Sequence, residues 1–422
     1  MTRPTIQILA GGLLALALAG CGNTTSPDAA TGTALTYAVV DTGLTTCYNA
    51  SGLISAPRAG EPFYGQDGQQ TGLPPAYRDN GDGTVSDPNT GLMWVQARGS
   101  KVAWEAARTG ASACRVGGYS DWRMPAIKEL YSLIQFTGRA GQTTADSTPY
   151  LDTRYFGFAY GDVSAGERVY DCQDWSATAY VGTTMNGDAT AFGVNFADGR
   201  IKGYPLVRNP AIDPAGGSGD FLLYARYVRG NPAYGQNRFL EPGDGTITDE
   251  ATGLMWTRED SGSGMNWQEA LAWVQARNAD NHLGHSDWRL PNAKELQSLV
   301  DYTRAPEATD ALRRGPAIDP ILSSTSIIDE GGGEDYPFFW TSTTHLEGLG
   351  GPGSAAVYVA FGRALGFMQT SPGTFHLWDV HGAGAQRSDP KAGDPAAFPR
   401  GFGPQGDVIR IRNFVRLVRN AS

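Results

Sequence analysis

The sequence predicts an α+β, loop-rich protein built from two tandem copies of one module. Gly makes up 56 of the 422 residues, nearly twice the roughly 7% of average proteins, which indicates many turns. The chain is longer than the roughly 250–300 residues that one hydrophobic core usually holds. A set of motifs also occurs twice, in the same order and with nearly constant spacing.

A glycine-rich turn opens each copy. In the first copy, Gly-Asp-Gly-Thr within residues 81–87 leads to Thr-Gly-Leu-Met-Trp at 90–94, and residues 243–249 and 252–256 repeat this pattern. An Asp-Gly turn beside alternating apolar and polar residues is typical of a β-hairpin. We therefore expect each copy to begin with a hairpin that enters its core.

Two helices should follow each hairpin. In the second copy, Asn266 with Glu269 and Asn292 with Glu295 form capping boxes ahead of apolar stripes. The first-copy counterpart of the earlier helix is a weaker pattern at 101–108. Glycine-rich loops and short strands complete each copy, so its sheet should be small, irregular and antiparallel.

The repeat sets the domain boundaries. An Asp-Trp-Arg-Met/Leu-Pro motif followed by Lys-Glu-Leu occurs at 120–130 and again at 286–296. Each copy closes with a segment that contains two arginines. We expect the two domains to comprise residues 37–230 and 231–422.

The start of the chain predicts export. A positively charged start precedes an apolar run at 6–19, too short to span a bilayer, and Leu-Ala-Gly-Cys ends at Cys21. This ending resembles the bacterial lipobox. The resemblance implies that residues 1–20 are a lipoprotein signal peptide, that Cys21 carries the lipid and that 21–36 form a flexible tether. Because Gly and not Asp follows Cys21, the resemblance also favours the outer membrane or cell surface. A plain signal peptide with no lipid on Cys21 is the alternative.

Charge and composition argue against several kinds of site. The net charge of −10 disfavours nucleic acid as a partner. The five histidines show no metal-ligand spacing, so neither a metal nor a cofactor is expected. Four aspartates of the repeated turns offer oxygen ligands for calcium, but their spacing does not fit an EF-hand and a structural turn is favoured. These residues are Asp82, Asp87, Asp244 and Asp249.

The ordered motifs resemble the Lcl C-terminal domain family, named after the end domain of a collagen-like bacterial adhesin. The likeness spans roughly residues 37–422. It implies a fold akin to C-type lectins and the formylglycine-generating enzyme, in which two helices pack against a small irregular sheet. It also implies recognition at the cell surface. Sulfated glycans, which the adhesin's end domain engages, are not expected here because the chain is acidic.

Six motif residues are expected to stabilise the core. The tryptophans stand beside Leu, Met and Pro, which favours packing over sugar stacking. The arginines should bind loop carbonyls or a carboxylate such as Asp121 or Asp287, and clamping of an anionic ligand is the alternative. The six are Trp94, Trp122, Arg123, Trp256, Trp288 and Arg289.

Candidate ligand contacts lie near the C-terminus and in loops. Basic residues there alternate with apolar ones, which predicts a partly exposed terminal strand or, alternatively, a glycan or protein contact face. Loops at 331–337, 348–353 and 376–406 are stronger candidates for specificity, since recognition usually resides on loops. The basic residues are Arg410, Arg412, Arg416 and Arg419.

The cysteines favour a disulfide over catalysis. Once Cys21 is lipidated, Cys47, Cys114 and Cys172 remain, and an exported chain favours a Cys114–Cys172 bridge. No histidine lies in the first domain, so a base for a nucleophilic cysteine is lacking there and no catalytic residue is expected.

The sequence thus predicts a lipid-anchored surface protein that binds a glycan or a protein without catalysis. One alternative is a structural envelope component of a multiprotein surface complex. The other is an enzyme of the formylglycine-generating type, which is disfavoured because the thiols do not recur in the second copy.

Overall fold

The computed structural model describes residues 35–210, 218–347 and 351–421. The predicted signal peptide, Cys21 and most of the predicted tether lie outside these described residues. Leu35–Ser422 form one compact unit. Within the described ranges, no helix has both the length and the apolar character needed to cross a membrane.

Each copy opens with the expected hairpin, extended to a four-stranded antiparallel sheet. In the first copy the order is β3-β4-β5-β13, and in the second it is β14-β15-β16-β24. Gly83 and Gly245 adopt positive φ angles of 84° and 88° in the tight turns. The strands are β3 (Arg78–Asp79), β4 (Thr84–Asp87), β5 (Leu92–Val95), β13 (Val228–Gly230), β14 (Phe239–Leu240), β15 (Thr246–Asp249), β16 (Leu254–Thr257) and β24 (Val418–Asn420).

Two α-helices follow the hairpin in each copy. Asn266 and Asn292 cap the second-copy helices and form the expected capping boxes with Glu269 and Glu295. Ala103 precedes the first helix and offers no side-chain cap, which agrees with its weaker sequence pattern. The helices are α1 (Trp104–Gly110), α2 (Ile127–Ser132), α3 (Trp267–Ala279) and α4 (Ala293–Ser298).

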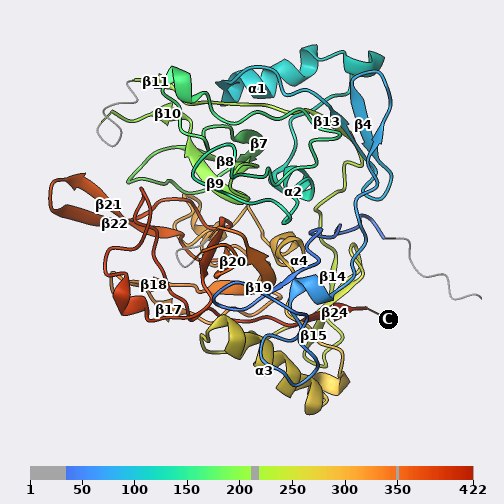
Figure 1. The fold of residues 1–422 in the computed structure, drawn as a ribbon, viewed down its shortest axis with the longest axis vertical. Coiled ribbons are helices and arrows are strands. Elements are labelled where there is room, and N and C mark those ends of the chain that lie inside the picture. The colour runs from blue at the N-terminus through green and yellow to red at the C-terminus, as the bar shows by residue number, and fades with distance from the viewer. Residues whose placement is uncertain (1–34, 211–217, 348–350, 422) are drawn as a thin grey trace, which may run out of the picture. The chain divides into compact units, whose positions relative to one another are not determined.

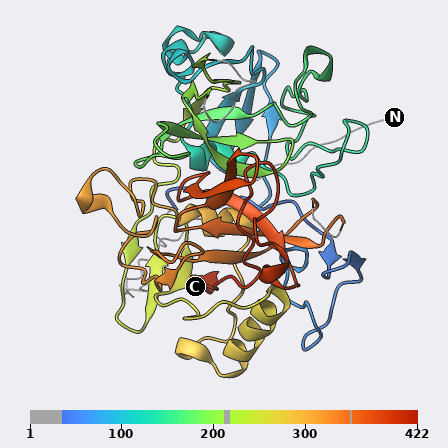
Figure 2. The ribbon, with the colours of Figure 1, turned by 90° about the vertical axis from the view of Figure 1, so that its left-hand side faces the viewer.

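The two copies share one antiparallel sheet of order β19-β20-β23-β9-β8-β7 (Figures 1 and 2). Three strands come from each copy, and the order is symmetric about the junction of β9 with β23. There, Gln386 pairs with Ile201. The strands are β7 (Asp174–Ala179), β8 (Thr190–Asn195), β9 (Arg200–Pro205), β19 (Phe338–His345), β20 (Ala355–Ala360) and β23 (Gln386–Pro390).

Reciprocal lysine contacts strengthen the junction on the helical side of this sheet. Nζ of Lys128 in α2 donates to the carbonyl of Ser298 over 2.6 Å, and Nζ of Lys294 in α4 donates to that of Ser132 over 2.9 Å. These residues occupy equivalent places in the two copies. Each lysine therefore satisfies a carbonyl at the C-terminal end of the other copy's helix.

The segment before the first hairpin contacts both copies. The carbonyl of Thr42 accepts a hydrogen bond from the Phe136 amide of the first copy, 2.8 Å. Oδ2 of Asp67 accepts from Thr343 Oγ1 of the second copy, 2.6 Å, and from Thr42 Oγ1, 2.8 Å. The segment, which the repeat alone assigned to the first domain, thus links the two copies. It contains β1 (Cys47–Tyr48) and β2 (Leu53–Ile54).

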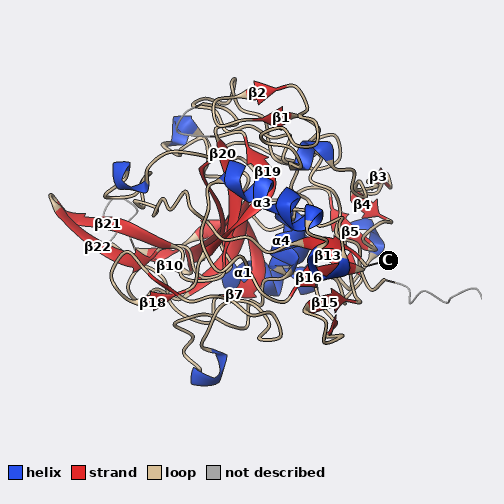
Figure 3. Ribbon diagram, turned by 90° about the horizontal axis from the view of Figure 1, so that it is seen from below, coloured by secondary structure: helices blue, strands red, loops and turns tan. Residues whose placement is uncertain are grey.

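The remaining short strands form separate two-stranded antiparallel sheets. Among them, β21 and β22 form a hairpin that projects from the second copy (Figures 1 and 3). The short strands are β6 (Val102–Ala103), β10 (Val207–Arg208), β11 (Gly219–Asp220), β12 (Leu222–Leu223), β17 (Ile327–Ile328), β18 (Glu334–Asp335), β21 (Leu365–Ser371) and β22 (Thr374–Asp379).

Candidate functional site

A groove of about 430 Å³ lies in the second copy. Its walls come from β17, from the start of β19, and from the chain around residues 395–399 and 408–414. Most lining side chains are apolar, and Ile328 at the rim is 71% exposed. The apolar walls are formed by Ile327, Ile328, Phe367, Phe398, Pro399 and Val408.

Two of the predicted contact arginines lie at this groove. Arg410 Nε donates to Glu330 over 2.9 Å, and its guanidinium lies 3.9 Å from the ring centre of Phe338. The Arg412 side chain is 56% exposed and forms an ion pair with Glu269 at 3.3 Å. Arg412 is therefore the more accessible of the two cations.

The other two predicted contact arginines are buried, which corrects their assignment as ligand contacts. Arg416 is fully buried and donates to the carbonyls of Thr257 and Arg258. Arg419 is 8% exposed, and its Nε donates to Asp287 over 2.7 Å. The terminal strand β24 is buried except for Asn420, so it is not the partly exposed strand that was expected. The guanidinium groups of Arg416 and Arg419 lie inside, where they satisfy carbonyls and a carboxylate.

The predicted specificity loops contribute to the groove in part. Pro337 from the loop 331–337 and Pro395 and Phe398 from 376–406 line it. The segment 376–406 also supplies β23 to the shared sheet, so only part of it is loop. Residues 348–350 of the remaining predicted loop lie outside the described residues.

The motif tryptophans do not form a sugar-binding platform. Trp94 and Trp256 are fully buried, and Trp122 and Trp288 are 4% and 2% exposed. Nε1 of Trp288 donates to the carbonyl of His282 over 2.8 Å. Rings buried in this way contribute apolar contact area to the core.

Each motif arginine binds a glutamate that the sequence did not predict as its partner. Both terminal nitrogens of Arg123 donate to Glu129, and those of Arg289 donate to Glu295. Glu295 Oε2 also accepts from the Asn292 amide over 2.9 Å, so one carboxylate caps α4 and orders the loop before it. The spacing from this Arg to the Glu of Lys-Glu-Leu is the same in both copies and could have indicated the pair. The aspartates expected as partners, Asp121 and Asp287, bind other arginines.

The repeated aspartates act within the turns. Oδ1 of Asp82 accepts from the Thr84 amide and hydroxyl, 3.0 and 2.6 Å, and Asp244 binds Thr246 in the same way. The buried carboxylates of Asp87 and Asp249 accept backbone amides. Within the described ranges, no group of three or more His, Cys, Asp or Glu side chains could hold a metal ion.

The expected Cys114–Cys172 disulfide is not formed, and Cys47, Cys114 and Cys172 are free thiols. Cys172 is fully buried, and its sulfur lies 3.7 Å from the carbonyl of Val169. Cys114 is partly exposed at the end of a short 3₁₀ turn. Burial raises the pKa of the Cys172 thiol to about 12.

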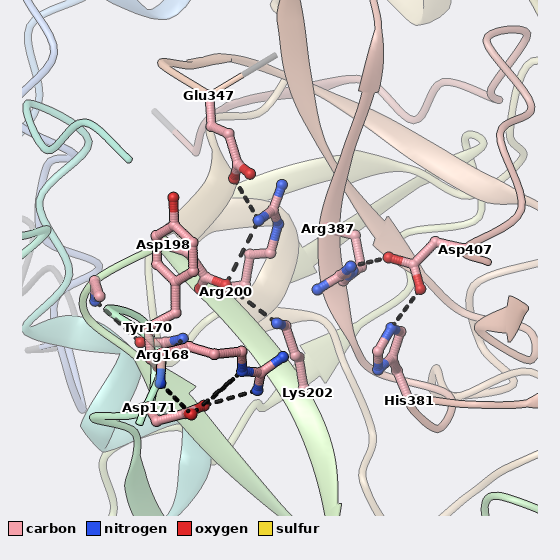
Figure 4. Close-up of polar contacts among 12 residues, drawn as sticks. Arg168, Tyr170, Asp171, Asp198, Arg200, Lys202, Glu347, His381, Arg387 and Asp407 are labelled. Carbon is pink, nitrogen blue, oxygen red and sulfur yellow. Dashed lines mark hydrogen bonds and ion pairs between the residues drawn. The ribbon is translucent and has the colours of Figure 1, made fainter. Parts of the chain in front are cut away.

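A second candidate site is a cluster of charged side chains at the junction of β9 with β23 (Figure 4). In the first copy, Lys202 Nζ donates to Asp198 over 3.1 Å. In the second, Arg387 donates to Asp407, whose Oδ1 lies 2.8 Å from His381 Nε2. These residues lie outside the repeated motifs, so the repeat gave no indication that they form a site.

The neighbouring cations keep the Asp198 carboxylate of this cluster ionised. Burial alone would raise the pKa of Asp198, but the neighbouring cations Lys202, Arg200 and Arg387 lower it to about 2. Burial lowers the pKa of Lys202 to about 8, and Arg387 adds to this effect. The cluster therefore presents both a carboxylate and closely spaced cations at neutral pH.

Comparison with known proteins gives one family match. The family model described as the Lcl C-terminal domain matches residues 83–211 and 245–381, together more than half of the chain. Each matched segment begins in the turn of one opening hairpin. The first segment ends after β9, and the second ends at residue 381, ahead of β23. No curated protein and no solved structure matches the chain. The chain belongs to the Lcl C-terminal domain family.

Proposed function

We propose that this protein is a lipid-anchored, non-enzymatic recognition protein of the cell surface, and that the groove of its second copy binds a protein ligand. Its family is associated with surface and adhesin proteins, which supports recognition outside the cell. The observation that carries the proposal is the groove itself, which gathers exposed apolar side chains, Arg412 and parts of the predicted specificity loops.

The lining favours a protein over a glycan. Apolar surface removed from water stabilises a complex by about 25 cal/mol per Å². Sugar hydroxyls would lose hydrogen bonds to water and find few partners between Ile328, Phe367 and Phe398. The exposed guanidinium of Arg412 adds a preference for an acidic group beside the apolar anchor.

The remaining parts of the proposal concern fold and location. A C-type-lectin-like fold is supported by the two helices of each copy, which lie beside short antiparallel strands. A lipid on Cys21 would place the groove at the outer membrane or cell surface. Incorporation of radiolabelled palmitate should be lost in a Cys21→Ser variant, and label that survives this change would contradict the anchor.

A structural role in a surface complex is the second candidate. It is favoured by the same groove, because a permanent partner also buries apolar residues such as Ile328. The two roles differ in whether the partner remains bound during purification.

The groove can be tested with a matched pair of exposed residues. Ile328→Asp should abolish capture of peptides that combine apolar and acidic residues, because it places a carboxylate on the apolar rim. Leu312→Asp is the control, since Leu312 is 90% exposed in the same copy and does not line the groove. Saturable peptide binding by the full chain, lost only in the first variant, supports recognition.

Three other results would change the proposal. Saturable binding on a glycan array with no peptide binding would replace the protein ligand by a glycan. Stable co-purification of an envelope protein, lost with Ile328→Asp, would favour the structural role. Equal effects of Ile328→Asp and Leu312→Asp would remove the groove from either function.

A further inference from the structure

Several buried polar atoms at the junction of β9 with β23 lack a hydrogen-bond partner among the described residues. They are Oδ1 of Asp198, Nε of Arg200, the hydroxyl of Tyr204 and Nη1 of Arg387. Asp198, Tyr204 and Arg387 are only 4%, 7% and 7% exposed. An unpartnered buried polar atom destabilises the fold, so a group of them at one junction points to a bound polar ligand.

Strand geometry places these side chains on one face of the sheet. Arg200 and Tyr204 alternate with Ile201 along β9, so they lie on the face opposite Ile201 and the largest apolar core, where the Tyr204 ring packs in a smaller apolar cluster. Gln386 is paired with Ile201, which places the next residue of β23, Arg387, on the same face as Arg200. The site therefore needs both copies, and neither copy contains it alone.

The bonds already present leave specific atoms available. Asp198 uses Oδ2 for Lys202, and Arg387 uses Nη2 for Asp407, so Oδ1 and Nη1 remain (Figure 4). Tyr204 lies on the same face of β9 as Lys202, and burial and then the charge of Asp198 raise the pKa of its hydroxyl, whereas Arg387 lowers it. The available atoms comprise N–H or O–H donors and one carboxylate acceptor.

We propose that this junction binds inorganic phosphate. Phosphate oxygens would accept from Nη1 of Arg387, Nε of Arg200 and the Tyr204 hydroxyl. Inorganic phosphate keeps an O–H at neutral pH, and this O–H would donate to Oδ1 of Asp198. Sulfate and the phosphodiester of a lipid headgroup carry no such O–H, so the carboxylate repels them.

A route to the site follows from the exposure of its edge. The side chains of Arg168, Asp171 and Glu347 are 63%, 28% and 34% exposed, whereas those of Asp198 and His381 are 5% and 4% exposed. The first three lie around Asp198 on the side of the first-copy loop and the end of β19, whereas His381 lies on the other side of the cluster beside Asp407 (Figure 4). This partly exposed edge is the side from which a small anion would enter.

The test is calorimetric titration of the full chain with sodium phosphate and with sodium sulfate at equal ionic strength. We expect saturable phosphate binding with one site per chain, and sulfate binding that is weaker by about tenfold or more. Tyr204→Phe should weaken phosphate binding about tenfold by removing one donor without breaking any protein hydrogen bond. Vesicles that contain phosphatidylglycerol should not compete with phosphate.

Control variants at similar residues outside the junction separate the loss of a phosphate contact from an effect on the stability of the protein. Tyr77→Phe is the control for Tyr204→Phe, because Tyr77 also carries a buried unpartnered hydroxyl but packs against Tyr155 and Phe156. Arg387→Lys should weaken binding about tenfold, whereas the control Arg108→Lys, at a side chain that is 56% exposed, should not. Asp198→Asn should narrow the difference between phosphate and sulfate, because an amide can donate to either anion.

Three outcomes would overturn the proposal. The first is the absence of saturable phosphate binding, in which case water alone satisfies the junction. The second is equal affinity for sulfate or competition by the vesicles. The third is an equal effect of Tyr204→Phe and Tyr77→Phe. If Arg387→Lys or Asp198→Asn fails to fold, the two tyrosine variants still decide the question.

Discussion

Arg416 offers a direct test of how tightly the two copies are coupled. It is fully buried, and its terminal nitrogens donate to the carbonyls of Thr257, Arg258 and Ser323. Arg226 occupies the equivalent place in the first copy and donates to the carbonyls of Val95, Gln96 and Gly157. Substitution by Leu in either copy would remove these hydrogen bonds, although the Gln96 carbonyl would keep the Gly157 amide as a donor.

The expected decrease in the free energy of unfolding follows from the hydrogen bonds that Arg416 makes. The hydrogen bond to Thr257 is buried, and those to Arg258 and Ser323 are partly buried. Loss of each bond from the charged guanidinium costs about 1–3 kcal/mol, and removal of the buried charge offsets part of the sum, so Arg416→Leu should cost about 3–5 kcal/mol. A cooperative unit of roughly 400 residues has an unfolding entropy of about 0.8 kcal/mol/K. The melting temperature should therefore fall by about 4–6 °C.

Differential scanning calorimetry of both variants provides the assay. Because the copies share one sheet, Arg226→Leu and Arg416→Leu should each shift a single common transition. The exposed control Arg412→Leu should change stability by no more than about 0.5 kcal/mol. Two separate transitions, of which each variant moves only one, would refute the coupling. A shift of Arg416→Leu no larger than that of the control would refute the role of its hydrogen bonds.

Three further predictions concern single residues. Burial raises the pKa of Asp67 to about 7 from an unfolded value of about 3.9, so the stability gained from its bound proton is lost as pH rises through 7. The free energy of unfolding in urea should therefore fall from pH 5 to pH 8, and this fall should be smaller in Asp67→Asn than in wild type. Asn292→Ala should destabilise the protein by about 1 kcal/mol in the same assay, because it removes the cap of α4; no change would contradict this role. Cys172 should react with a thiol reagent far more slowly than Cys114 in the native state, and equal rates would contradict its burial.

Local elements followed from the sequence because their determinants are close together in the chain. The Asp-Gly turn fixes each opening hairpin, and Asn266 and Asn292 fix the starts of α3 and α4. The candidate groove was anticipated only in part. Arg410 and Arg412 line it as ligand-contact candidates, but alternation alone could not show that Arg416 and Arg419 turn inward.

By itself, the sequence determined the repeat, the order of its elements and the family, since these depend on residue identity at fixed spacing. Only the tertiary structure decided that the two copies share a sheet. The backbone contacts that join the two copies here, such as the Gly203 amide of β9 to the carbonyl of His381 ahead of β23 at 2.8 Å, use groups that nearly every residue carries and so leave no sequence signature. The same junction brings Asp198 and Arg387 together, although each lies outside the motifs that define its copy.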